Sequence, residues 1–153
     1  MGKVLGRREV KKAVDSAKDE GKKIVFTNGC FDIIHLGHVR YLKKAKGLGD
    51  VLVVAVNTDR SVSRLKKGRP IMRDSQRAEV VASLDMVDYV TLFDEDTPYE
   101  LIRFLRPDVL VKGGDWKKEA IVGSDIVPKT CSLPYVKGIS TTGIIRKIRK
   151  LSE

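Results

Sequence analysis

Short apolar runs alternate with helical patterns along the whole chain of 153 residues, and this alternation constrains the fold more than any other feature. Residues 23–28 (KIVFTN) and 51–56 (VLVVAV) are mainly apolar and β-branched, which is typical of strands buried on both faces of a parallel sheet. Residues 38–46, between them, have a helical pattern that GLGD ends. This order predicts a right-handed βαβ unit.

The alternation continues on both sides of this unit. Residues 7–20 place apolar side chains on one helical face, and Gly21 ends that pattern. The other expected elements are strands at 87–93, 108–114 and 132–136 and helices at 75–85, 97–105 and 142–151. We therefore expect an α/β fold, with a Rossmann-like doubly wound parallel sheet of five strands and helices on both faces. A single domain spans residues 1–153, with its core at 22–149.

Composition limits the classes of function. The longest uncharged runs, which include 24–31 and 51–58, have eight residues each, whereas a membrane span needs about 20 apolar residues. The chain starts without an apolar signal region, so we expect a cytoplasmic protein with no membrane partner. Cys30 and Cys131 are too few for a disulfide framework. The net charge of +10 favours anionic partners without choosing among nucleic acid, nucleotide and lipid.

The only two histidines, His35 and His38, lie three residues apart around Gly37. At a helix start that follows a buried strand, this spacing lets both imidazoles face the same way, next to the free N–H groups of the helix. Gly37 removes a side chain that would keep a phosphate away from the backbone. The pattern predicts an anion site. The alternative is that one histidine caps the helix or lies in the core while the other is exposed.

Other metal and phosphate motifs are missing from the sequence. Two histidines without a third ligand fall short of a zinc site, and we expect no protein ligands to a metal. No Walker A sequence is present. Glycine-rich or basic loops follow several of the predicted strands. Because the ligand site of a doubly wound sheet lies beyond the carboxyl ends of its strands, these loops can form one site.

Three blocks resemble the H-x-G-H nucleotidyltransferases, in their cytidylyltransferase-like branch. They are TNGCFDIIHLGH (27–38), RAEVVASLDMVDYV (77–90) and GISTTGII (138–145). The similarity spans roughly residues 22–149. Within that branch, DEDTPYELI (94–102) and LVKGGDWKKEAIVG (110–123) are similar to the adenylyltransferase half of the bacterial heptose kinase/adenylyltransferases.

The resemblance implies transfer of AMP from ATP, with Mg²⁺ on the triphosphate, to D-glycero-β-D-manno-heptose 1-phosphate, giving ADP-heptose and pyrophosphate. A separate heptose kinase would supply this acceptor, and the resemblance is compatible with a homodimer. Glycerol-3-phosphate cytidylyltransferase and FMN adenylyltransferase stay open as alternatives within the family. Tyr135 stands where the glycerol-phosphate enzymes have an arginine that helps to hold phosphate, which weakens the first alternative.

An alternative from another class is a noncatalytic nucleic-acid-binding domain, which the net charge and the basic stretch RKIRK (146–150) would also suit. Such a domain would bind polynucleotide without depending on either histidine. We expect no nucleic-acid partner, because the paired histidines and glycine loops fit a small anionic ligand.

The resemblance also implies roles for individual residues. The expected catalytic residues, all phosphate ligands, are His35, His38, Lys66 and Arg77. The expected nucleotide-binding residues are Asn28, Gly29, Cys30, Phe31, Gly37, Gly113, Gly114, Asp115, Ser140, Thr141 and Thr142. Among these, the glycine pair lets the backbone approach the adenine and ribose, and residues 140–142 supply hydroxyls and N–H groups at a helix start. Asp32 is expected to orient an imidazole or a metal-bound water.

Overall fold

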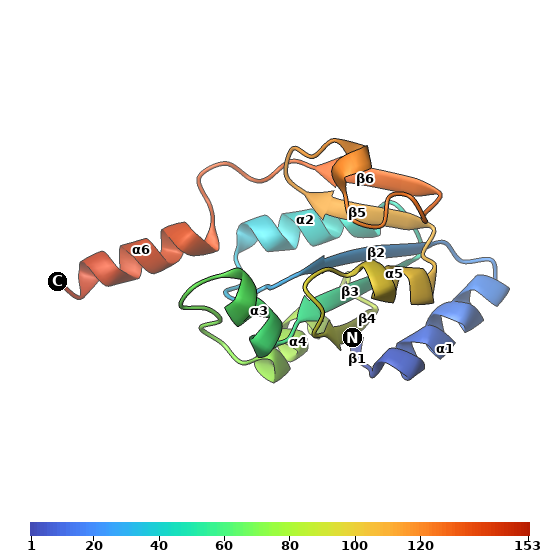
Figure 1. Ribbon diagram of the computed structural model, residues 1–153, viewed down its shortest axis with the longest axis horizontal. Helices are drawn as coiled ribbons and strands as arrows, with labels where there is room; N and C mark the ends of the chain where they lie inside the picture. Colours follow the sequence, from blue (N-terminus) through green and yellow to red (C-terminus); the bar gives the residue numbers. More distant parts are fainter.

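A computed structural model describes residues 1–153 and contains one parallel sheet of six strands. The strands are β1 (Lys3–Val4), β2 (Ile24–Gly29), β3 (Val51–Asn57), β4 (Tyr89–Phe93), β5 (Val109–Gly113) and β6 (Lys129–Leu133). The helices are α1 (Arg7–Asp19), α2 (Leu36–Lys46), α3 (Asp59–Leu65), α4 (Asp74–Ala82), α5 (Tyr99–Leu105), α6 (Thr141–Leu151) and the 3₁₀ helix η1 (Lys118–Ala120). The α/β class is confirmed (Figure 1).

The strand order is β1-β4-β3-β2-β5-β6, so the direction of winding changes between β2 and β5. The chain first builds outward from β2 through β3 to β4, and then crosses to β5 and β6 on the other side. The register between β2 and β5 covers only two pairs, Val25 with Val109 and Phe26 with Leu110. Beyond Phe26 and Leu110 the two strands no longer pair with each other, although β2 stays paired with β3 and β5 with β6. A crevice therefore opens between their carboxyl ends, where a doubly wound sheet binds ligands.

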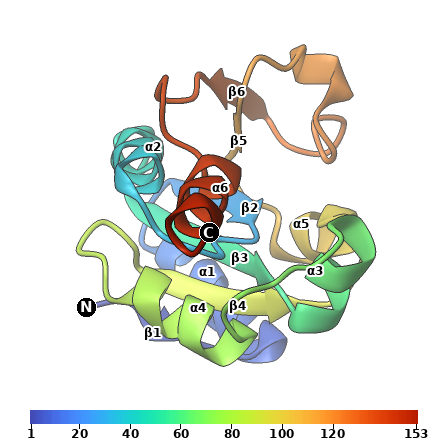
Figure 2. The same cartoon turned by 90° about the vertical axis from the view of Figure 1, so that its left-hand side faces the viewer.

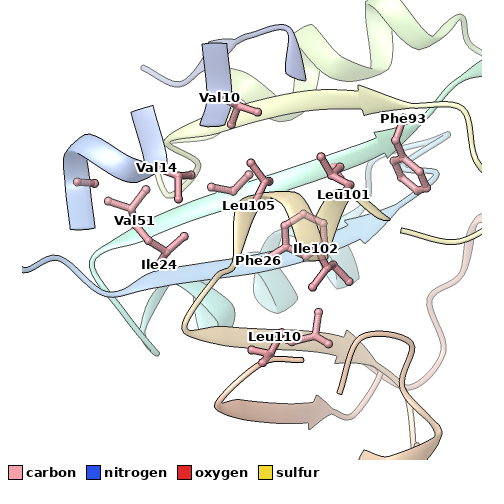
Figure 3. Packing of buried hydrophobic residues seen from close by; sticks show 14 of the residues in the cluster. Val10, Val14, Ile24, Phe26, Val51, Phe93, Leu101, Ile102, Leu105 and Leu110 are labelled. Carbon is pink, nitrogen blue, oxygen red and sulfur yellow. The ribbon is translucent and has the colours of Figure 1, made fainter. Parts of the chain in front are cut away.

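Helices cover both faces of the sheet, as expected. On one face α1 and α5 pack on the strands through a cluster of 15 buried residues that includes Val14, Phe26 and Ile102 (Figure 3). On the other face α2 and α4 pack through a second cluster of 15, which includes Leu42 and Val81. Burial of this apolar surface provides the main favourable free energy of folding.

Three details of the predicted order are wrong. The sheet has six strands and not five, because β1 is an edge strand of two residues, too short to show a pattern. Residues 132–136 were expected as a strand, but β6 ends at Leu133 because Pro134, which follows it, has no N–H to donate. The helix α3 was expected as loop. Only two of its residues are buried, so it shows little apolar periodicity.

The helix α6 differs from the other α-helices because none of its residues is buried. It extends away from the sheet in Figure 1, and Figure 2 looks nearly along it, with its body in front of β2 and β3. Ser140 caps it, accepting a hydrogen bond from Gly143 N at 3.0 Å. No helix of the structure has the length and apolar character needed to cross a bilayer.

Candidate active site

A pocket of about 760 Å³ lies at the carboxyl ends of β2 and β5. Its lining joins segments that are far apart in the sequence, from the end of β2 and the start of α2 to the start of α6. The expected site residues on this lining are Asn28, Gly29, Cys30, Phe31, His35, Gly37, His38, Lys66, Gly113, Ser140, Thr141 and Thr142. The remaining three, Arg77, Gly114 and Asp115, are not on it.

The two imidazoles lie side by side at the start of α2. Their ring centroids are 3.9 Å apart and their planes differ by 32°. His35 Nδ1 accepts a hydrogen bond from Gly37 N at 3.1 Å, and His38 Nδ1 accepts one from His35 N at 3.3 Å. A ring nitrogen that accepts a hydrogen bond carries no proton, so each neutral ring has its proton on Nε2. The backbone thus sets both rings as Nε2–H donors, and both rings line the pocket.

His35 is the N-cap of α2, so the alternative of a capping histidine holds for this residue alongside its place in the pocket. Burial lowers the pKa of both imidazoles. For His38 the pKa falls to about 4, because burial acts together with the charges of His35 and Lys66. Both rings are therefore neutral near pH 7, and they offer hydrogen bonds without a full positive charge.

Two glycines are required for this arrangement. A Cβ on Gly37 would lie 2.8 Å from Cε1 and 2.9 Å from Nδ1 of the His35 ring, closer than carbon side chains pack. A Cβ on Gly29 would lie 2.9 Å from the ring of Phe31, which in turn lies 5.4 Å from the ring of His38. Phe31 itself has a φ of +48°, a conformation that a bulky residue rarely adopts. The backbone on each side of the histidines is thus shaped to fit the two rings.

Arg77 lies behind the pocket wall and not on its surface. Its side chain is fully buried, and it donates to Cys30 O at 2.6 Å, to Met72 O at 2.9 Å and to Asp59 Oδ1 at 2.9 Å. These bonds use all three guanidinium nitrogens. The structure therefore gives Arg77 the role of holding Cys30 and Met72 in place, and a direct phosphate contact would require the buried side chain to become exposed.

Asp32 also has a role other than the expected one. Its carboxylate is nearly fully buried and accepts hydrogen bonds from Ile71 N at 2.8 and 2.9 Å and from Met72 N at 2.9 Å. It makes no hydrogen bond to either imidazole. Asp32 therefore ties the end of the 66–72 segment to the residues that precede His35, next to the bond that Arg77 makes to Met72 O.

The basic segment and the start of α6 meet at the pocket. Lys66 is exposed and lines the pocket close enough to His38 to lower its pKa. Arg69 Nη2 donates to Thr142 Oγ1 at 3.1 Å, and Thr141 Oγ1 donates to Ile33 O at 3.4 Å. The start of α6, residues 140–142, thus lines the same pocket as the histidines, and a helix start is a common site for anions.

The ring of Tyr135 covers Gly113, the last residue of β5, and Gly114, which was not predicted. A Cβ on Gly113 or Gly114 would lie within 3.1 Å of the Tyr135 ring, so that ring rests on the glycine backbone. Tyr135 is nevertheless 74% exposed. Trp116 Nε1 donates to Gly113 O at 3.0 Å. The Tyr135 ring lies where the family resemblance predicted the nucleotide base. Asp115 is exposed and lies outside the pocket lining.

Sequence reasoning missed two basic residues of the lining, Arg69 and Lys112. Arg69 lies in the basic stretch RLKKGRP (64–70), from which only Lys66 was predicted as a phosphate ligand. Lys112 was read as part of a strand end. The alternation of side chains along β5 could have identified Lys112, because it places Lys112 on the same face as the buried Leu110.

No group of three or more metal-ligating side chains occurs in the structure. A second hollow of about 780 Å³ lies beside the end of β4, but its charges pair with one another. Arg7 binds Glu95 at 2.7 Å and Arg64 binds Asp96 at 2.9 Å. The pocket at the histidines is different, because its three cations lack such partners.

Comparison with known proteins agrees with this geometry. The cytidylyltransferase-like family matches residues 26–147. The bifunctional protein HldE of Nitratiruptor sp. is 60% identical over 130 residues, which are 84% of this chain and 28% of that protein. The HldE of Wolinella succinogenes is 51% identical over 148 residues, or 96% of this chain and 31% of that protein.

Two solved structures share the fold. The lipopolysaccharide core biosynthesis protein from Thermoplasma volcanium has a TM-score of 0.66 and 32% identity, over 76% of this chain and all of that chain. Pantoate-beta-alanine ligase from Francisella tularensis has a TM-score of 0.63 and 19% identity, over all of this chain and 80% of that one, and supports the fold alone.

The chain therefore belongs to the cytidylyltransferase-like family of nucleotidyltransferases. It spans about 30% of the length of the curated HldE relatives that it matches. The family resemblance in the three sequence blocks is confirmed.

Proposed function

We propose that this chain transfers AMP from ATP to D-glycero-β-D-manno-heptose 1-phosphate, giving ADP-heptose and pyrophosphate. The observation that carries the proposal is the pair of neutral Nε2–H imidazoles in a pocket with unpaired cations and a helix start. The choice of heptose rests on the similarity of residues 94–102 and 110–123 to heptose-phosphate adenylyltransferases and on the identity to the HldE proteins.

The proposed reaction needs alignment and charge neutralisation more than a covalent intermediate. A phosphate oxygen of the acceptor forms a bond to the α-phosphorus of ATP, while the bond from that phosphorus to the bridging oxygen of pyrophosphate breaks. His35 and His38 donate hydrogen bonds to phosphate oxygens as negative charge builds during this displacement. Because their protons are fixed on Nε2, the donors need no reorganisation when the reaction occurs.

The rest of the pocket supplies charge for the leaving pyrophosphate. Lys66, Arg69 and the start of α6 at Ser140 converge on one space. Mg²⁺ commonly binds through few protein carboxylates, so the ATP phosphates and water could hold it here. The Asp32 carboxylate is not free to bind the metal, because it already accepts hydrogen bonds from backbone N–H groups. When bound, the metal would neutralise charge on the triphosphate.

A coupled assay of pyrophosphate release tests the proposal. Purified protein is mixed with Mg²⁺ and each of three substrate pairs, ATP with heptose 1-phosphate, CTP with glycerol 3-phosphate, and ATP with FMN. We expect release only with the first pair. Release only with another pair would assign the chain to that branch, and no release with any pair would contradict the proposed activity.

The noncatalytic alternative is tested with the same sample. A nucleic-acid-binding domain would bind polynucleotide in a salt-dependent manner and would tolerate loss of both histidines. We expect no such binding at physiological salt.

The proposed reaction also implies a source for the acceptor. A sugar 1-phosphate is itself the product of a sugar kinase. We infer a cytoplasmic location, because ATP is the donor.

A further inference from the structure

The pocket contains more positive charge than its own residues neutralise. Lys66, Arg69 and Lys112 line it, and none of them belongs to any of the eight ion pairs of the structure. Its two carboxylates are already engaged, since Asp32 binds backbone N–H groups and Asp96 binds Arg64. The three cations therefore have no counter-charge within the chain and can bind an anionic ligand.

Lys112 is the most constrained of these three. It lies on β5, so the sheet fixes its backbone, whereas Lys66 and Arg69 lie on a segment between helices. Its Nζ lies 5.7 Å from the centroid of the Trp116 ring and makes no hydrogen bond within the protein. A half-buried ammonium without a counter-charge costs free energy, so this position destabilises the unliganded chain.

The environment of Lys112 places it near the reacting groups. Burial lowers the pKa of Lys112, while Cys30 raises it and Lys66 lowers it further. Lys66 also lowers the pKa of His38. The Lys66 side chain is thus electrostatically coupled to both His38 and Lys112, which stand on the β2 side and the β5 side of the crevice.

The proposed reaction, on which this inference rests, brings two phosphoryl groups together. The triphosphate has the start of α6, Lys66 and Arg69 available to it. The acceptor phosphate is a second anion, and the neutral histidines do not offset its charge. We infer that Lys112 binds the phosphate of the sugar 1-phosphate acceptor, across the crevice from His35 and His38.

Kinetics of Lys112→Met test this assignment. Methionine keeps the length of the side chain and removes the charge. We expect the KM for the sugar 1-phosphate to rise about tenfold or more, with the KM for ATP changed by less than about twofold. Lys112→Arg, which keeps a cation, should recover part of the loss. Lys118→Met is the matched control, because Lys118 is exposed on η1 outside the pocket.

Calorimetry gives a readout besides activity. Titration of sugar 1-phosphate into the protein should show weaker binding to Lys112→Met than to wild type or Lys118→Met. The thermal midpoint of Lys112→Met should equal or exceed that of wild type, since the variant loses an unpaired charge. A lower midpoint would show that Lys112 supports the fold.

The two proposals fail in different ways. If wild type releases no pyrophosphate with any acceptor, the proposed function falls. If wild type is active and Lys112→Met keeps its acceptor KM and acceptor affinity, only the assignment of Lys112 falls. A rise confined to the KM for ATP would reassign Lys112 to the nucleotide and overturn the inference.

Discussion

Asp59 and Asp74 cap each other's helices. Asp59 Oδ1 accepts a hydrogen bond from Asp74 N at 2.8 Å, and Asp74 Oδ2 accepts one from Asp59 N at 2.9 Å. Asp59 begins α3 and Asp74 begins α4, so the exchange joins the two helix starts. The guanidinium of Arg77 donates to the same Asp59 oxygen. A polar cluster of Asp59, Asp74 and Arg77 therefore joins the two ends of the segment that carries Lys66 and Arg69.

Loss of the Arg77 guanidinium should destabilise the fold. Arg77→Met leaves Cys30 O and Met72 O without a donor and leaves the Asp59 carboxylate with only the backbone N–H of Asp74. We expect a loss of about 3 kcal/mol in the free energy of unfolding, measured by urea denaturation. Unchanged stability with abolished activity would instead support the phosphate-ligand role predicted from the sequence.

The tautomers of the two histidines can be observed directly. Because His35 and His38 are the only histidines, nitrogen-15 spectra of the imidazoles contain two sets of signals. We expect both rings to be neutral at pH 7 with the proton on Nε2, and His38 to titrate only near pH 4. A signal typical of the Nδ1–H tautomer would contradict the hydrogen bonds described above.

The buried imidazole should also make stability depend on pH. The folded pKa of His38, about 4, lies below its ordinary value of 6.5, so the unfolded chain takes up a proton first as pH falls. This contribution is fully present above pH 6.5 and is lost progressively toward pH 4. Urea midpoints at pH 7 and pH 5 measure it. His38→Gln should show a smaller difference between the two pH values than wild type does.

Removal of one donor should affect turnover and not folding. His38→Ala should lower kcat by about a hundredfold or more in the pyrophosphate assay, while its circular dichroism spectrum stays that of wild type. Lys118→Ala should retain full activity, since Lys118 is exposed on η1. Equal losses in both variants would point to general destabilisation and away from the imidazole.

Gly37→Ala tests the packing of the histidine pair. The added methyl group would stand 2.8 Å from the His35 ring and force it out of its place as the cap of α2. We expect activity to fall nearly as far as in a His35→Ala variant. Gly47→Ala is the control, because its Cβ, at the other end of α2, would meet only two backbone oxygens, at 3.3 and 3.7 Å. Full activity in Gly37→Ala would show that the ring position is not critical.

Most of the fold follows from local patterns. The strands β2 and β3 are strongly β-branched and buried on both faces, so their positions could be predicted within about a residue. The two-residue β1 and the start of β6 depend on pairing with distant strands, which no local pattern reports. The α/β class was predictable, but the length and edges of the sheet were not.

The position of the site could be predicted from the sequence, but the places of some of its residues could not. The His35–His38 spacing identified the pocket, since spacing along one helix start is a local property. Arg77 was predicted as a phosphate ligand from the family resemblance, and the structure places its side chain behind the pocket wall. Its position four residues before the buried Val81 already put it on the inner face of α4. Lys112 was missed because its place on the lining depends on how distant segments converge around the pocket.

The two walls of the pocket come from segments 108 residues apart in the sequence, and Thr141 donates to Ile33 O where they meet. The histidine wall is anchored in the buried clusters through β2 and α2, whereas α6, which begins the hydroxyl wall, buries none of its residues. The hydroxyl wall can therefore shift relative to the histidines at little cost in buried apolar surface.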